Sequence, residues 1–311
     1  MAEISAPGGC EIGLRPIDLH LSSLRLMGAE IGTEGGVLSC SCPDGLHGEK
    51  ITLSFPSVGA TENILIAAAC AEGETVILNA AREPEIADLA DFLNSCGARI
   101  FGADSGEITV CGVKKLHSAE HTVIPDRIIA STYMAVAAGG GGGVIFYQHK
   151  EHITPVIPVF EQAGCKIDCD ENSVHIRAPE RLRSVRTVRT MPYPGFPTDS
   201  QAAVMAMLSV AHGTSVVIEN IFENRYRHVR ELCRLGADIM TEGKVAVIKG
   251  VDTLNGACVC AADLRAGAAL AVAGLAAQGS TTIENVRLID RGWQDMEKTL
   301  RSLGADIRRE S

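Results

Sequence analysis

A phrase of the form Gly-Ala-x-Ile, with Cys in place of Ala in one copy, occurs five times and limits what this chain can fold into. Its glycines are Gly28, Gly97, Gly164, Gly236 and Gly304, so successive copies lie 67 to 72 residues apart. Solenoid repeats have periods of about 20–50 residues, and a longer period suits a small α/β unit. The sequence therefore predicts an array of similar subdomains.

Each copy follows an amphipathic helix, with apolar residues such as Ile86, Ala90 and Leu93 three or four apart, and precedes β-branched residues typical of strands. The glycine is then expected to be the helix C-cap, because it can adopt the left-handed conformation. A second set of helices is rich in Ala and apolar nearly all round, which predicts burial; it covers residues 61–71, 127–138, 200–211 and 264–278. Each unit should be a β/α repeat rather than part of a doubly wound sheet.

Two features interrupt the pattern. The glycine run 139–143 lacks the Lys-Ser/Thr of a phosphate loop and is expected to be an expanded turn. The copy at Gly28 is preceded by only half a unit. A balanced array of two domains with three units each would need roughly 100 more residues at this period, so we expect an incomplete first domain.

Composition excludes several classes of protein. A 46% hydrophobic content over 311 residues is enough for more than one core. No apolar run of about 18 residues occurs, and the first nine residues lack a secretory signal, so a cytoplasmic location is expected. A net charge of −10 argues against a nucleic-acid partner.

The eleven cysteines include no C-x-x-C pair, and their odd number favours reduced thiols. Cys40 with Cys42, and Cys258 with Cys260, could in principle share a metal ion. This spacing instead places both thiols on one face of a strand, so neither a metal nor a cofactor is expected.

Basic residues stand at the predicted entries of the surface helices: Arg15, Arg82, Lys150, Arg225 and Arg291. A cation is unfavourable at a helix N-terminus, and a bound anion would remove the conflict. Alternatively each cation is solvated or paired with a nearby acid such as Glu83, Glu223 or Asp290. We favour an anionic ligand for the set as a whole.

The starts of the buried helices carry aspartates, namely Asp126, Asp199 and Asp263, which fit ordinary N-caps. Cys10 lies in a loop with glycines on both sides and cations nearby, so it is either a reactive thiol or an incidental surface cysteine. The residues alone do not decide between these two interpretations.

With these motifs in order, the chain resembles the UDP-N-acetylglucosamine 1-carboxyvinyltransferases over nearly its whole length. The matching segments are PGGCEIGLRPIDLH (7–20), FPSVGAT (55–61), NAAREPEI (79–86), IPDRI (124–128), PGFPTDSQA (194–202), IFENR (221–225), ADLRA (262–266) and IDRGW (289–293). The resemblance implies an inside-out α/β barrel fold of two pseudo-symmetric domains, residues 1–124 and 125–311, with the active site in the cleft between them.

The resemblance also implies roles for individual residues. Cys10 would be the general acid toward phosphoenolpyruvate and the target of fosfomycin, and Asp199 would accept the proton of the sugar 3-hydroxyl. Arg291 would complete the catalytic set. The nucleotide would be bound by Arg15, Pro16, Ile17, Asp18, Leu19, His20, Phe55, Pro56, Ser57, Val58 and Gly59, and Ile221, Arg225, Asp263 and Arg265 would contact the sugar, the enolpyruvate or its phosphate.

The implied reaction transfers the enolpyruvyl group of phosphoenolpyruvate to UDP-N-acetylglucosamine, the first committed step of peptidoglycan synthesis. The family's N-terminal Lys-Asn pair and a further arginine have no counterpart in these 311 residues, so we expect this chain alone to have negligible activity. The alternatives are a non-catalytic nucleotide-sugar-binding protein, the shikimate-pathway enolpyruvyl transferase and an RNA-phosphate cyclase. The PGGC loop disfavours the shikimate enzyme, and the acidic charge disfavours the cyclase.

Overall fold

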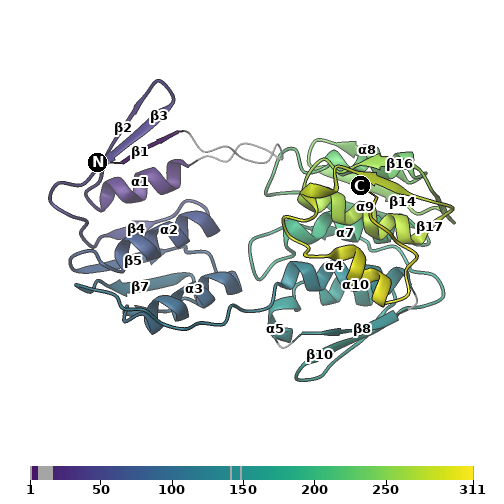
Figure 1. The fold of residues 1–311 in the computed structure, drawn as a ribbon, viewed down its shortest axis with the longest axis horizontal. Coiled ribbons are helices and arrows are strands. Elements are labelled where there is room, and N and C mark those ends of the chain that lie inside the picture. Colours follow the sequence, from purple (N-terminus) through teal and green to yellow (C-terminus); the bar gives the residue numbers. More distant parts are fainter. Residues whose placement is uncertain (1, 6–16, 141, 148, 311) are drawn as a thin grey trace. The chain divides into compact units, whose positions relative to one another are not determined.

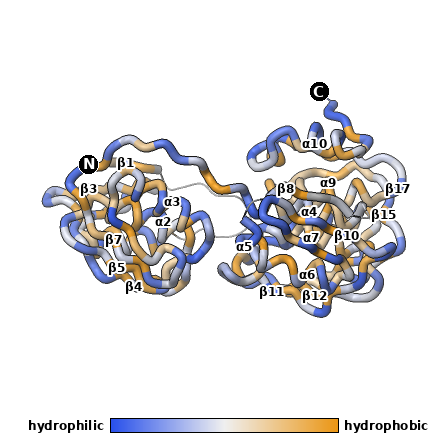
Figure 2. The backbone as a smooth tube through the Cα atoms, turned by 90° about the horizontal axis from the view of Figure 1, so that it is seen from below, coloured by the Kyte–Doolittle hydropathy of each residue, from blue (hydrophilic) through white to orange (hydrophobic). Residues whose placement is uncertain are grey.

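The computed structural model describes residues 2–5, 17–140, 142–147 and 149–310 (Figure 1). They form two compact units, and each has its own apolar core. Unit 1 consists of the described residues up to Ile124 together with Pro192–Pro194, and unit 2 of those in Pro125–Met191 and from Gly195 onward. Along the tube of Figure 2, hydrophobic residues (orange) gather in the strands and inner helices, and the loops are mostly hydrophilic.

Unit 1 combines two sheets with three helices. Strands β1 (Ala2–Ser5), β2 (Glu30–Glu34) and β3 (Val37–Ser41) pair antiparallel in the order β1-β3-β2, with α1 (Asp18–Leu26) between β1 and β2 in the chain. The second sheet has the order β4-β5-β7-β6, and only β4 and β5 are parallel. Its elements are β4 (Lys50–Thr52), α2 (Val58–Ala68), β5 (Glu74–Leu78), α3 (Pro84–Ser95), β6 (Ile100–Phe101) and β7 (Glu107–Cys111).

Unit 2 contains the same arrangement of strands and helices. Its middle sheet has the order β11-β12-β14-β13 and again one parallel pair, β11 with β12. The elements are β11 (Val188–Arg189), α7 (Thr198–Leu208), β12 (Thr214–Ile218), α8 (Arg227–Arg234), β13 (Asp238–Glu242) and β14 (Val245–Lys249). Because the element order and the pairing match those of unit 1, the predicted β/α repeat is confirmed.

Two further repeats flank this one. The first contains α4 (Arg127–Gly139), β8 (Gly142–Phe146), α5 (Lys150–Ile153), α6 (Ile157–Gln162), β9 (Lys166–Cys169) and β10 (Ser173–Arg177), with the sheet order β8-β10-β9. The last contains β15 (Leu254–Asn255), β16 (Cys258–Cys260), α9 (Leu264–Ala276), β17 (Ala277–Gln278), β18 (Thr282–Glu284), the 3-10 turn η1 (Val286–Leu288) and α10 (Met296–Ser302). Strand β15 is parallel to β17, and β16 is parallel to β18.

The helices predicted to be buried form the interior of unit 2, where α4, α7 and α9 pack against one another (Figure 1). Residues 200–208 of α7 are all buried. Both α2 and α7 begin two or three residues earlier than predicted and end three earlier. Helix α2 begins there because the Ser57 hydroxyl caps it, accepting from the amide of Ala60 at 3.3 Å.

All five repeat glycines have φ between +93° and +97°. In each copy the glycine N–H donates to the carbonyl three residues back, and the next residue donates to the carbonyl five residues back, as Gly97 to Asn94 and Ala98 to Leu93 illustrate. This is the Schellman arrangement, so the predicted C-caps are confirmed.

A second repeated device was not predicted from the sequence. Asn79, Asn220 and Asn285 each follow the second strand of a parallel pair and donate a side-chain N–H to a carbonyl at the end of the first strand. These amide groups fix the ends of paired strands where the loops leave the sheet. Short loops that enter α3, α8 and α10 therefore start from a defined position.

The glycine run was predicted to be an expanded turn, and this was wrong in part. Gly139 ends α4, and Gly142 and Gly143 already belong to β8, paired with Arg177 and Ile176. A Cβ on Gly142 would lie 2.5 Å from the carbonyl oxygen of Ile176, so the glycine allows close strand pairing. Among the described helices, none has the length and apolar character needed to cross a membrane.

We expect Gly97→Ala to destabilise α3 by about 1–2 kcal/mol, because a residue with a Cβ is strained at φ +96°. The new methyl group would also lie 3.0 Å from the His117 ring, which must give way. Gly106→Ala is the matched control, since Gly106 has no left-handed φ and no atom of the described residues lies within 4 Å of the added methyl group. Hydrogen exchange of α3 amides measures the difference, and equal protection in both variants would contradict the cap assignment.

Candidate active site

The residues predicted to form the site fall into two groups, one in each unit. Cys10, Arg15 and Pro16 lie outside the described residues. Ile17, Asp18, Leu19 and His20 stand at the start of α1, and Phe55, Pro56, Ser57, Val58 and Gly59 lead into α2. Ile221, Arg225, Asp263, Arg265 and Arg291 belong to unit 2, together with Asp199.

Unit 1 brings its two predicted segments together. The Nδ1 atom of His20 shares a hydrogen bond with the amide of Asn63, one turn after Gly59 on α2. A Cβ on Gly59 would lie 3.2 Å from the His20 ring, so the glycine allows this close contact. Burial lowers the pKa of His20, although Asp18 opposes the shift, and a neutral ring at neutral pH follows.

Three charged side chains meet in unit 2 where α7, α8 and α9 begin. One Asp199 oxygen accepts from Nη2 of Arg225 and lies 3.3 Å from Nε of Arg265. The Asp199 side chain is 40% exposed, whereas Arg225 is buried. Burial raises the pKa of Asp199, but Arg265 and Arg225 lower it by more, and the net pKa lies below the ordinary aspartate value.

Asp199 was also considered as an N-cap, and the structure contradicts that possibility. Pro197 occupies the cap position of α7, and no side chain in the described part of the chain caps this helix. Asp126 and Asp263 do cap α4 and α9, each accepting from two backbone amides, as predicted. The carboxylate of Asp199 is thus aligned by arginines rather than by backbone N–H groups.

A buried carboxylate not predicted from the sequence orders the loop before Arg225. Glu219 is 1% exposed, and its Oε1 accepts from the hydroxyl of Thr190 and the amides of Ile221 and Phe222. Its Oε2 accepts from the hydroxyl of Thr198, next to Asp199. With four donors, the buried charge is satisfied and ties this loop to the start of α7.

Arg265 is held in place by an aromatic ring. Its guanidinium lies 5.2 Å from the centre of the Trp293 ring, a cation–π contact. The loop carrying Arg291 and Trp293 lies against the first turns of α9, since a Cβ on Gly267 would clash with Ile289 at 2.5 Å and one on Gly292 with Leu264 at 2.9 Å. Arg291 itself is exposed.

Pairing with nearby acids was the alternative to an anionic ligand for these cations, and the structure gives Arg225 and Asp290 distant partners instead. Arg225 pairs with Asp199 rather than Glu223, and Asp290 pairs with Arg309 at 2.6 Å. Glu83 accepts from the amides of Arg82 and Tyr193 through its two oxygens. Ion pairing set by the tertiary fold was not visible in the local sequence.

His228 lies behind Arg225 and was not predicted as a site residue. It is 1% exposed, and its Nε2 has no hydrogen-bond partner among the described residues. Burial lowers the pKa of His228 to about 4, with Asp263 raising it and Arg225 lowering it further. At neutral pH, His228 is therefore a neutral imidazole on α8, close enough to Arg225 and Asp263 for their charges to affect its pKa.

This histidine should make the chain less stable in acid. The unfolded chain binds a proton near pH 6.5 and the folded chain only near pH 4, so stability falls as pH decreases between these values. We expect a loss of about 2–3 kcal/mol between pH 7 and pH 4.5, and His228→Gln should remove that part of the pH dependence. Urea unfolding of both proteins at the two pH values tests this; parallel losses would exclude His228 as the source.

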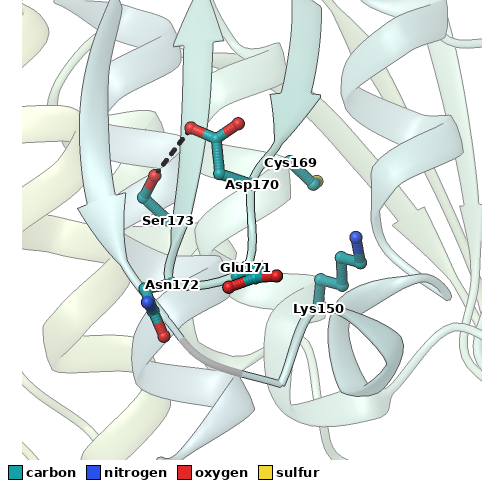
Figure 3. Close-up of a pocket in the computed structure, with 6 residues that line it drawn as sticks. All are labelled: Lys150, Cys169, Asp170, Glu171, Asn172 and Ser173. Atoms are coloured by element: carbon teal, nitrogen blue, oxygen red, sulfur yellow. Dashed lines mark hydrogen bonds between the residues drawn. The ribbon is translucent and has the colours of Figure 1, made fainter.

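Two other polar groupings lie in the first repeat of unit 2. Lys150 lines a shallow pocket with Cys169, Asp170, Glu171, Asn172 and Ser173, and its amino group points into it (Figure 3). His149, Glu151 and His152 place three ligand atoms within 4.8 Å of one another, which is close enough to hold a cation. Glu151 is 61% exposed and shares a 3.1 Å hydrogen bond with His149, so a surface hydrogen bond accounts for the closeness of these groups.

The ten cysteines among the described residues are free thiols. Cys258, in β16, donates to Glu284 at 3.5 Å. Desolvation raises the pKa of this thiol most, and the hydrogen bond and charge of Glu284 raise it further. Cys40 lies in β3 and Cys42 just after its end. The described part of the chain places no third ligand with either pair.

Comparison with known proteins gives consistent results. Residues 2–300 match the family model of EPSP synthase (3-phosphoshikimate 1-carboxyvinyltransferase). A UDP-N-acetylglucosamine 1-carboxyvinyltransferase 2 of Caldanaerobacter subterraneus subsp. tengcongensis is 51% identical over 98% of this chain and 73% of its own length. The UDP-N-acetylglucosamine 1-carboxyvinyltransferase of Finegoldia magna is 50% identical over 97% and 72%.

Solved structures agree on the fold. The enolpyruvyl transferase NikO from Streptomyces tendae has a TM-score of 0.86 at 25% identity, covering 94% of this chain and 72% of that one. EPSP synthase from Acinetobacter baumannii has a TM-score of 0.72 at 20% identity, covering 99% and 75%. The predicted α/β fold class is thereby confirmed.

Proposed function

Because this chain belongs to the EPSP synthase family of enolpyruvyl transferases, we propose that it transfers the enolpyruvyl group of phosphoenolpyruvate to the 3-hydroxyl of UDP-N-acetylglucosamine, releasing phosphate. The observation that carries the proposal is the carboxylate of Asp199 between Arg225 and Arg265. A base beside two cations suits a reaction that removes a hydroxyl proton next to an anionic substrate. The product would be the first committed precursor of peptidoglycan.

In the proposed reaction Asp199 takes the proton of the sugar hydroxyl while the hydroxyl oxygen of the sugar bonds to C2 of the enolpyruvyl group. The Cys10 thiol protonates the methylene carbon, C3. Phosphate then leaves C2 and takes up the proton held by Asp199, and C3 returns a proton to the Cys10 thiolate, which restores the double bond. Arg225, Arg265 and Arg291 would bind the donor's carboxylate and phosphate, and Asp263 would hold α9 and Arg265 in place.

The nucleotide is assigned to unit 1. The segments 17–20 and 55–59, with Arg15 and Pro16, would bind the uridine and diphosphate, and the contact of His20 with Gly59 supports their acting together. Ile221 would line the sugar site. We also propose that residues 1–124 and 125–311 are the two transferase domains and that the protein is cytoplasmic, with no nucleic-acid or membrane partner.

The two main alternatives differ in acceptor and in turnover. Relatives named for UDP-N-acetylglucosamine are about half identical to this chain, whereas an EPSP synthase structure is 20% identical, which favours the nucleotide sugar over 3-phosphoshikimate. A nucleotide-sugar-binding protein without activity would not need a carboxylate between two arginines. Both alternatives can be excluded in one assay.

The assay measures phosphate released from phosphoenolpyruvate by the protein expressed from its own gene, with UDP-N-acetylglucosamine, 3-phosphoshikimate or no acceptor. Of the three conditions, we expect phosphate release only with UDP-N-acetylglucosamine as acceptor, at a rate in the usual range of about 1–10³ per second. Release with 3-phosphoshikimate alone would assign the shikimate reaction. Tight binding of the nucleotide sugar without release would assign a binding protein.

Cys10 should be the fastest-reacting of the eleven cysteines toward fosfomycin, and faster with UDP-N-acetylglucosamine bound. A free thiol is mostly protonated at pH 7, and cations such as Arg15, five positions along the sequence, would favour the thiolate of Cys10. Peptide mass mapping measures the labelling, and the exposed thiols of Cys70, Cys233 and Cys258 are internal controls. Labelling spread over these controls, or a rate indifferent to the nucleotide, would make Cys10 an incidental surface cysteine.

A further inference from the structure

The base of the proposed reaction is already engaged in this structure. Asp199 accepts from Arg225 and lies within ion-pair distance of Arg265, both through the same oxygen. A carboxylate held by two guanidinium groups is a weak base, because losing its charge would break both pairs. The arrangement stabilises the ionised form and opposes proton uptake.

The arginines have further capacity to donate. Arg225 also donates to the carbonyl of Thr198, and its Nε is buried with no hydrogen-bond partner among the described residues. Arg265 uses Nε toward Asp199, and its guanidinium lies over the Trp293 ring. The guanidinium groups of Arg225 and Arg265 both face the partly exposed Asp199 carboxylate. Another anion could therefore replace this carboxylate as the acceptor of their N–H groups.

The charges around the cluster favour such an exchange. Asp199 faces Arg225 from the loop before α8 and Arg265 from α9, with His228 of α8 and Asp263 of the α9 cap behind them. Glu219 is satisfied by its four donors and contacts this site through Thr198. With His228 neutral, Arg225 and Arg265 carry the positive charge that faces Asp199, so an entering anion would compete with the Asp199 carboxylate for their N–H groups.

We infer that Arg225 and Arg265 hold Asp199 as an unreactive ion pair until the anionic group of the donor substrate takes over their N–H groups, which frees the carboxylate to act as base. This inference rests on the proposed function. The entering anion withdraws donors from Asp199 and adds a nearby negative charge, and both changes make the carboxylate more basic. Base strength is thereby coupled to occupation of the donor site.

The test follows the carboxyl ¹³C signal of Asp199 in the full chain, labelled in aspartate and assigned by its absence in Asp199→Asn. The signal is titrated downward from pH 7 to the limit of the folded state, with and without inorganic phosphate as the probe. Without phosphate we expect Asp199 to stay ionised below the ordinary value of 3.8. Phosphate should raise the midpoint by at least about one unit, the usual effect of a charge partner.

Asp126, which caps α4 through two backbone amides, is the matched control and should not respond to phosphate. Arg265→Gln should raise the Asp199 midpoint without phosphate and reduce the response to it; Arg265→Lys serves the same purpose if the first variant does not fold. An unchanged Asp199 midpoint in saturating phosphate, or no phosphate binding, would overturn the inference. Since no turnover is needed, this outcome is distinct from a failed transferase assay.

Discussion

Asp199→Asn should lower the transferase rate by about 10² or more while leaving the chain folded. Asparagine keeps an oxygen that can accept from Arg225 and Arg265, so both guanidinium groups retain a partner. It cannot take a proton from the acceptor hydroxyl. We expect a stability loss of about 1–3 kcal/mol, because the buried Arg225 then faces a neutral group. Phosphate release and circular dichroism together measure the two effects.

Asp126→Asn is the control for this substitution. Asp126 is the N-cap of α4 and has no role in the proposed reaction, and asparagine is an equally good cap. Rate and stability should therefore both stay near those of the unchanged protein. A folded Asp199→Asn protein with a near-normal rate would show that Asp199 only aligns the arginines. The proton acceptor would then have to be another group.

The repeat carries most of what the sequence could predict. The same backbone conformations recur at similar spacing along the chain. The residue type alone therefore predicted the left-handed glycines Gly97 and Gly236 and the capping aspartates Asp126 and Asp263. Each depends on a local conformation that few residue types satisfy. The Asn79, Asn220 and Asn285 contacts recur as well, but their partners lie on another strand, and no local pattern identifies them.

The charged site depended on tertiary packing. Asp199 and Arg225 are 26 positions apart in the same repeat, and Arg265 comes from the repeat that follows it. Local reasoning favoured an anionic ligand for the helix-entry cations and named Glu223 as an alternative partner of Arg225, because near neighbours are the default partners for a cation. The three helix starts meet only because α7, α8 and α9 pack together. Glu219 and His228 could not be predicted for the same reason, since only their burial in the folded structure distinguishes them from surface residues.

Trp293→Ala should destabilise unit 2 by about 3–5 kcal/mol, the usual cost of removing a large buried aromatic side chain. Trp293 is 1% exposed and packs with Ile289, Met296 and Leu300 against α9. Its loss would also free Arg265 from the ring that holds its guanidinium, so the Michaelis constant for phosphoenolpyruvate should rise. Urea unfolding followed by circular dichroism measures stability, because this chain has a single tryptophan and its fluorescence would be lost.

Trp293→Phe separates packing from the polar group of the indole. The Nε1 atom is buried without a hydrogen-bond partner in the described part of the chain, so phenylalanine removes an unsatisfied donor while keeping an aromatic face for Arg265. We expect it to cost about 1–2 kcal/mol, well below the alanine variant, because the smaller cavity is partly offset by the relieved N–H. If phenylalanine were as costly as alanine, the indole Nε1 would have a hydrogen-bond partner in solution. If alanine cost less than about 1 kcal/mol, the Trp293 cluster would not be what fixes Arg265 beside Asp199.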